Sequence, residues 1–177
     1  MTLEEMKQKV LLLVEEYNED ADLLTDDDDI GNKLNTVINQ VLTEISRFKK
    51  IDAVTTMEVE QGDIIEFSSL DKFYQLNIIK GADCDVTGQR IIANETGTID
   101  IYYYRYPTQI NAETEDSQVL DLSIDALEVA VYGIAADLLK SDVSSNYGAV
   151  YAQRYQEMLS TLDSRNVMFS VTFGEGV

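Results

Sequence analysis

The sequence contains no histidine and only one cysteine and one proline. Histidine is the commonest general base and the commonest metal ligand in proteins, so its absence excludes most hydrolase mechanisms and most zinc sites. Cys84 has no second cysteine to pair with, which excludes an intrachain disulfide and a thiolate metal cluster. We therefore expect a protein that is not an enzyme and that holds neither a metal nor a cofactor.

Signals for export and membrane insertion are lacking, and positive charge is scarce. No signal-peptide pattern opens the chain, and no apolar run approaches the ~20 residues that span a bilayer. The 13 Lys and Arg residues stand against 33 Asp and Glu, which gives a formal net charge of -20. This balance argues against binding to DNA phosphates or to an anionic membrane. Because 45% of the residues are hydrophobic, we predict a soluble, folded domain in a reducing cytoplasm.

Hydrophobic residues recur at helical spacing in four stretches, which predict helices over residues 2–18, 30–49, 123–139 and 147–164. Thr2 and Glu5 form a capping-box pattern at the start of the first helix. The stretch 123–139 is apolar over most of its circumference and contains small residues such as Ala130 and Gly133, so we expect it to be the central packing helix. Ser123 is expected to cap this helix through its hydroxyl group.

From Ala53 the hydrophobic period changes from that of a helix to that of a strand. Alternating segments predict strands over residues 54–60, 64–67, 73–79, 89–93 and 98–106. The last segment is rich in tyrosine, a residue that suits either base stacking and sugar binding or a half-buried strand. In so acidic a chain we favour the half-buried strand.

Together these patterns predict an α+β fold. Residues 1–50 and 112–165 are expected to form a four-helix bundle, in which the first two helices make an antiparallel pair. Residues 51–111 are expected to form an inserted antiparallel β subdomain that projects from one end of the bundle. Residues 166–177 are expected to form a strand-like C-terminal docking tail.

An acidic run joins the first two helices and ends in Asp26, Asp27, Asp28 and Asp29. Two of these aspartates and Gly31 match positions one, three and six of an EF-hand calcium loop. Ile30 and Val37 then occupy positions five and twelve, where calcium needs oxygen ligands. The run therefore predicts a solvated loop whose last aspartates cap the second helix.

The tail alternates apolar and other residues like a single strand. Its candidate docking residues are Val167, Met168, Phe169, Val171 and Phe173. An alternating strand at a chain end needs a partner, which is either the chain's own β subdomain or a sheet edge on another subunit. We favour pairing in trans by strand addition, with either a subunit of another protein or a neighbouring copy of the chain.

The layout of the chain is similar to that of a known family. The β region ends in Tyr103-Tyr104-Arg105-Tyr106-Pro107, an alanine-rich helix follows, and the last helix carries Tyr151-Ala152-Gln153-Arg154-Tyr155-Gln156-Glu157-Met158-Leu159. With the helix, acidic loop and helix before them, these segments resemble the head–tail adaptor (connector, or head-completion) proteins of tailed bacteriophages.

The resemblance implies a structural virion protein at the head–tail interface, assembled in the host cytoplasm. It implies a dodecameric ring beneath the portal protein that extends the DNA-exit channel and meets a downstream tail or stopper protein. It also implies a C-terminal segment that reaches up to the portal, so that a portal subunit is the other protein with which the tail would pair in trans. DNA would pass through such a ring without specific binding.

Net charge is compatible with this role, because an acidic wall repels phosphate and lets a duplex slide. The alternative is an acidic inhibitor that mimics DNA and blocks a nucleic-acid enzyme. Such a mimic explains the charge equally well. It does not explain the alanine-rich central helix or the trailing apolar strand.

Overall fold

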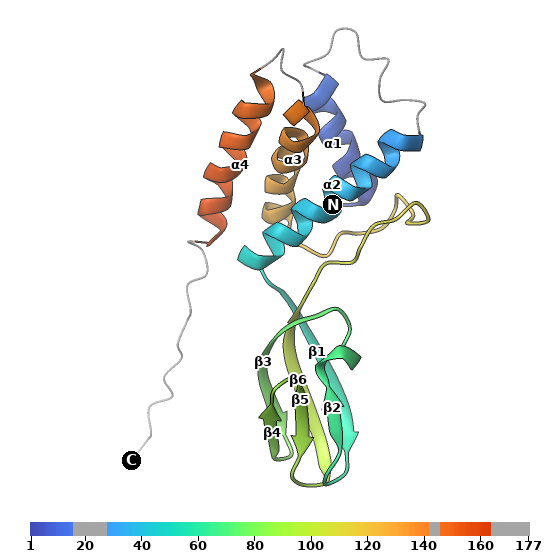
Figure 1. Cartoon of the computed structure of the whole chain (residues 1–177), viewed down its shortest axis with the longest axis vertical. Helices are drawn as coiled ribbons and strands as arrows, with labels where there is room; N and C mark the ends of the chain where they lie inside the picture. Colours follow the sequence, from blue (N-terminus) through green and yellow to red (C-terminus); the bar gives the residue numbers. More distant parts are fainter. Residues whose placement is uncertain (16–27, 142–145, 164–177) are drawn as a thin grey trace.

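The computed structural model describes residues 1–15, 28–141 and 146–163. The helices are α1 (Leu3–Glu15), α2 (Asp28–Phe48), α3 (Ile124–Leu138) and α4 (Tyr147–Asp163), with short 3-10 helices η1 (Phe67–Ser69) and η2 (Leu139–Ser141). The strands are β1 (Ile51–Val59), β2 (Ile64–Glu66), β3 (Phe73–Gly81), β4 (Cys84–Thr87), β5 (Arg90–Ala93) and β6 (Gly97–Arg105). The helices gather at one end of an elongated molecule, and the strands project from it (Figure 1).

Helix α3 is the centre of the helical part, as its sequence predicts. It packs against α1, α2 and α4, and Leu127, Ala130 and Ile134 are almost completely buried. Small residues permit this close packing. A Cβ atom added to Gly133 would lie 2.9 Å from the Tyr155 ring and 3.0 Å from Val41, so α2 and α4 both reach α3 at this glycine.

The prediction of a four-helix bundle is wrong. In a bundle each helix runs beside two neighbours around a shared axis. Here α1, α2 and α4 each pack on α3, and α1 makes its main helix contact with α3 rather than with α2. Figure 1 shows α2 lying obliquely across α3. The physical reason is that α3 is apolar around most of its circumference and therefore accepts helices on several sides.

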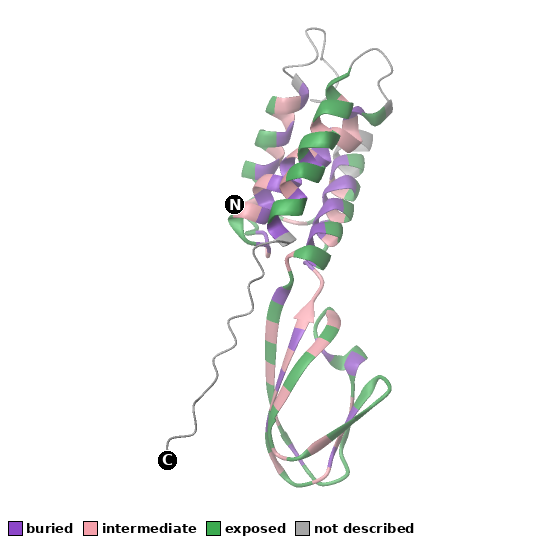
Figure 2. Cartoon of the chain, turned by 90° about the vertical axis from the view of Figure 1, so that its left-hand side faces the viewer, coloured by how far each residue is buried: buried purple, intermediate pink, exposed green. Residues whose placement is uncertain are grey.

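One hydrophobic cluster nevertheless joins the four helices. Figure 2 shows its buried residues along the inner sides of the helices. Apolar residues at helical spacing in the sequence belong to it, among them Val41, Ile45, Leu127, Val131, Ile134 and Tyr155. The sequence pattern therefore located the buried positions, although it gave the wrong helix arrangement.

The helix starts are only partly as predicted. The capping box is confirmed, because the Thr2 backbone N–H donates to Glu5 Oε2 at 2.9 Å and the Glu5 N–H donates to Thr2 Oγ1 at 3.2 Å. Ser123 is the N-cap residue of α3, but its side chain makes no capping hydrogen bond. Hydrogen bonding with the Ser123 hydroxyl instead lowers the pKa of Asp125.

The strands form two three-stranded antiparallel sheets in the described chain, in the orders β1-β6-β3 and β2-β5-β4. Both sheets contribute to a second hydrophobic cluster that includes Ile91, Ile99 and Ile101. The sequence did not predict strand β4. Its four residues, Cys-Asp-Val-Thr, are mostly exposed and show no buried–exposed alternation.

Candidate interaction surfaces

Most of the predicted site residues lie outside the part of the chain that the structure describes. These are Asp26, Asp27, Val167, Met168, Phe169, Val171 and Phe173. Asp28 and Asp29 are the first two residues of α2, which begins two residues earlier than predicted. The solvated acidic loop and the partner of the tail therefore stay predictions.

A bidentate ion pair stands where β6 leaves the β sheets. Arg105 donates from Nη2 to Asp121 Oδ1 at 3.0 Å and from Nη1 to Asp121 Oδ2 at 3.2 Å. The two side chains are 20% and 16% exposed. Asp121 also accepts the Thr108 backbone N–H at 2.7 Å. We call this arrangement the junction pair, because it joins the end of β6 to the segment that leads into α3.

The junction pair keeps Asp121 ionised. Burial alone would raise the Asp121 pKa, but the hydrogen bonds from Arg105 and Thr108 outweigh it and hold the pKa below its usual range. A half-buried carboxylate with three hydrogen bonds is satisfied in its charged form. The pair is therefore structural rather than a source of protons.

A second contact fixes the same connecting segment to α2. The Asn39 side chain donates to the Ile110 carbonyl oxygen at 2.7 Å and accepts the Ile110 N–H at 2.8 Å. Tyr106 N–H donates to the Lys72 carbonyl oxygen at 2.8 Å on the strand side of the junction. Hydrogen bonds thus link the helices and the sheets, in addition to the two connecting segments between α2 and β1 and between β6 and α3.

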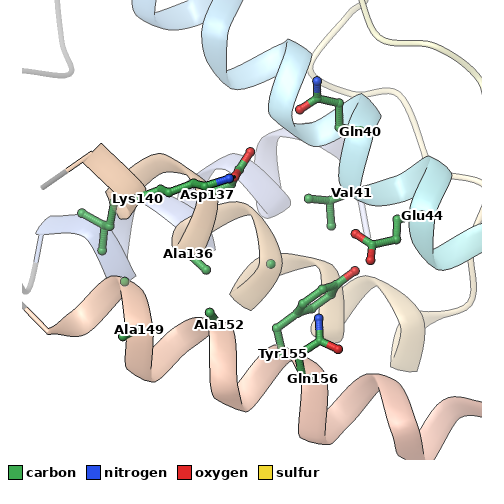
Figure 3. Close-up of a pocket in the computed structure, with 13 residues that line it drawn as sticks. Gln40, Val41, Glu44, Ala136, Asp137, Lys140, Ala149, Ala152, Tyr155 and Gln156 are labelled. Atoms are coloured by element: carbon green, nitrogen blue, oxygen red, sulfur yellow. The ribbon is translucent and has the colours of Figure 1, made fainter.

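An open groove of about 540 Å³ lies between α2, α3 and α4. Small residues from the two later helices line it, among them Gly133, Ala136, Ala149 and Ala152. Figure 3 shows Tyr155 and Glu44 at one end of the groove, with the phenol hydroxyl directed toward the carboxylate.

The Tyr155 hydroxyl is a buried polar group that lines this groove. The residue is 6% exposed, and no described residue gives the hydroxyl a hydrogen bond of regular geometry. Burial, followed by the negative charge of Glu44, raises the pKa of Tyr155 well above its usual range. The phenol is therefore protonated at neutral pH and cannot act as a base.

The outer face of the β1-β6-β3 sheet carries exposed apolar and aromatic side chains. Val54 and Ile78 flank Tyr102 on the two sides of β6 and are 55% and 48% exposed. Lys80 lies over the Tyr102 ring at 5.0 Å, and Lys50 lies over the Tyr104 ring at 4.3 Å. Tyr102 and Tyr104 are half-buried, as expected for tyrosines in a strand.

The described residues contain no group of three or more His, Cys, Asp or Glu side chains placed to hold a metal ion. None of the described helices is both long enough and apolar enough to cross a membrane. No protein-family model and no curated protein matches the chain.

The junction pair and the groove were not predicted from the sequence. Arg105 stood out within the strand end that carries the family resemblance, but Asp121 follows 16 residues later in a polar connection and had no pattern of its own. The small residues of α3 and α4 were visible as packing positions. Only the three-dimensional arrangement shows that some of them line an open surface.

Proposed function

We propose that this protein is a head–tail adaptor of a tailed bacteriophage, which assembles as a ring beneath the portal and extends the DNA-exit channel. The observation that carries the proposal is the order of its segments: helix, acidic run, helix, β region ending in Tyr103–Pro107, alanine-rich helix and Tyr/Arg-containing last helix. That order resembles the layout of adaptor proteins along nearly the whole chain.

The charge supports the proposal by a physical argument. A conduit must hold its own subunits together without holding DNA. At a formal net charge of -20 per chain, a ring repels a duplex at distances within the Debye length, about 8–10 Å at physiological salt. The duplex then stays in the middle of the channel and slides.

The two-part shape supports it as well. The helical part and the projecting sheets bury separate hydrophobic clusters, so each part is packed within itself and presents its own outer surface. A subunit of this kind offers two separately packed surfaces for contacts with neighbouring copies and with other proteins. Such a division suits a ring that lies between a portal and a tail.

The proposal is tested by native mass spectrometry of the purified chain mixed with the portal protein of the same virus. We expect a complex in which several copies of this chain, twelve by the family resemblance, join one portal ring. A matched sample contains nucleases and other DNA-binding enzymes of the host in place of the portal. A tight one-to-one complex with such an enzyme, and none with the portal, would contradict the adaptor and identify a DNA mimic.

A further inference from the structure

Strand β1 presents an open edge along its whole length. It pairs with β6 in an unbroken register from Ile51 opposite Arg105 to Val59 opposite Gly97. In the described chain no strand lies on its other side. Alternate residues of an antiparallel edge strand direct their N–H and C=O groups outward, so β1 offers a row of backbone donors and acceptors.

Strand β1 lacks most of the features that protect a sheet edge, although it carries two charged residues, Asp52 and Glu58. Natural edges are made short, are bent by bulges, or carry charged residues, above all lysine, and proline. The nine residues of β1 read Ile-Asp-Ala-Val-Thr-Thr-Met-Glu-Val, without lysine, proline or glycine. By contrast, edge strand β3 contains two register irregularities, and β2 and β4 have three and four residues. Among the described strands, β1 is thus the long edge that is regular and open.

The side chains along this edge are also incompletely covered. Ala53 and Met57 pack against the second hydrophobic cluster but remain half-buried. Val54, on the opposite face, is 55% exposed. An added strand would therefore gain backbone hydrogen bonds and would bury apolar surface on both faces of the sheet.

From these observations we infer that the β1 edge is the docking site for residues 167–173 of a second copy of this chain, by strand addition. The inference deepens the proposed ring and rests on that part of the proposed function in which copies of the chain meet. It names one surface and one occupant for the subunit contact.

The occupant matches the edge in length and pattern. The segment has seven residues, none of them charged. Strand β1 has nine residues. When Val167, Phe169, Val171 and Phe173 face the second cluster, they extend the apolar layer beside Ala53 and Met57. Met168, Ser170 and Thr172 then continue the outer face beside Val54.

The position of α4 favours a second copy over the chain's own edge. Figure 1 shows α4 ending, at Asp163, at the end of the helical part from which the sheets project. In the same view β3 lies on the α4 side of the sheet and β1 on the opposite side. To reach its own β1, the chain would have to pass β3 and β6, about 10 Å of sheet at the usual strand spacing.

The four steps from Asp163 to Val167 span at most about 14 Å when fully extended, and they must also bridge the space between α4 and the sheet. A neighbour related by a rotation can turn its β1 edge toward α4 of the first copy. This head-to-tail contact is heterologous, and its repetition closes a ring when the rotation between neighbours divides a full turn.

Disulfide trapping tests the inference in the full-length chain. In a Cys84→Ser background, Ser170→Cys is placed on one set of chains and Val54→Cys on another, and the mixture is oxidised at high protein concentration. Met168→Cys and Thr172→Cys in place of Ser170→Cys cover a register shifted by two residues. The matched control is Ile78→Cys, which lies on the same face of the same sheet, on the other side of Tyr102 and with similar exposure.

We expect a disulfide-linked dimer between the tail variant and Val54→Cys, at least tenfold more abundant than the dimer with Ile78→Cys. A preference for Ile78→Cys would overturn the inference, since the tail would then occupy β3. So would a disulfide confined to single chains when Val54→Cys and Ser170→Cys are combined, or no disulfide with any of the three tail positions.

The β1 docking site and the adaptor function are distinguished by separate results. If the Val54→Cys disulfide does not form but the chain still builds a ring on the portal, the adaptor stands and the β1 site is wrong. If the disulfide forms between copies but no complex with the portal exists, the β1 site stands and the adaptor is wrong.

Discussion

Arg105 and Asp121 meet in two parallel hydrogen bonds, 3.0 and 3.2 Å long, at the point where the chain passes from the sheets to the helices. Both side chains are mostly buried, and Asp121 accepts a further bond from the Thr108 backbone. Bidentate arginine–carboxylate pairs fix geometry as well as supplying energy. The junction pair is therefore expected to set how the β sheets stand relative to the helices.

Replacement of Asp121 with Ala should destabilise the protein by about 1–3 kcal/mol, because Arg105 would lose its partner in a poorly hydrated place. The control is Asp116→Ala, which breaks the exposed pair with Lys7, where Asp116 is 61% exposed. An exposed pair of this kind contributes at most about 1 kcal/mol. Urea denaturation measures both, and equal losses would contradict the structural role of the junction pair.

The junction pair also predicts a dependence of stability on pH. The Asp121 pKa is lower in the folded protein than its ordinary value, so its contribution is fully present above an unfolded-state pKa of about 4 and is lost as the pH falls through the folded-state pKa. Asp121→Asn should therefore lose less stability than the native chain between pH 5 and pH 3. Parallel unfolding midpoints across that range would show that Asp121 is not responsible.

Replacement of Ala130 with Leu should overpack the helical core and cost about 1–3 kcal/mol, because Ala130 is 0% exposed within the cluster around α3. Ala152→Leu is the matched control, since Ala152 is exposed and lines the open groove. The control should shift the unfolding free energy by less than about 0.5 kcal/mol. An Ala130→Leu variant as stable as its control would mean that this face of α3 is open.

Deletion of all residues after Asn166 should leave a folded protein with an unchanged helical circular dichroism signal. Within the described parts of the chain, both hydrophobic clusters are complete packing units built from residues before that point. The same variant should lose its association with other copies and its attachment to the portal. Unfolding or aggregation of the truncated chain would instead indicate that the tail completes the chain's own sheet.

Patterns along the chain predicted those features that depend on neighbouring residues. The Thr2–Glu5 capping box, the apolar character of α3 and the alternation of β1 and β6 follow from local spacing. The Ser123 cap is not formed: the hydroxyl group donates to the Asp125 carboxylate, two residues away, and its oxygen accepts no backbone N–H of the first turn. N-cap propensity identifies Ser123 as a good capping residue, but it does not determine which neighbouring group the side chain binds.

The arrangement of the helices and the junction pair could not be predicted in the same way. Helical periodicity gives the buried face of each helix but not the angle at which two faces meet. The oblique position of α2 depends on close approach at Gly133, where both Val41 and Tyr155 reach α3. Likewise, the pairing of Arg105 with Asp121 depends on how the connection folds back, and no local pattern records that path.

The purified chain should show no measurable binding to duplex DNA in a gel-retardation experiment, even at low salt, where attraction to phosphate is strongest. The reason is its formal net charge of -20. Salt-sensitive retardation of the duplex would count against a channel wall.

Electron microscopy of the chain bound to the portal protein is the decisive test of the adaptor. We expect a closed ring of this chain, coaxial with the portal, whose open centre continues the portal channel. Single copies scattered on the portal, or a ring whose centre is closed by the β sheets, would contradict it.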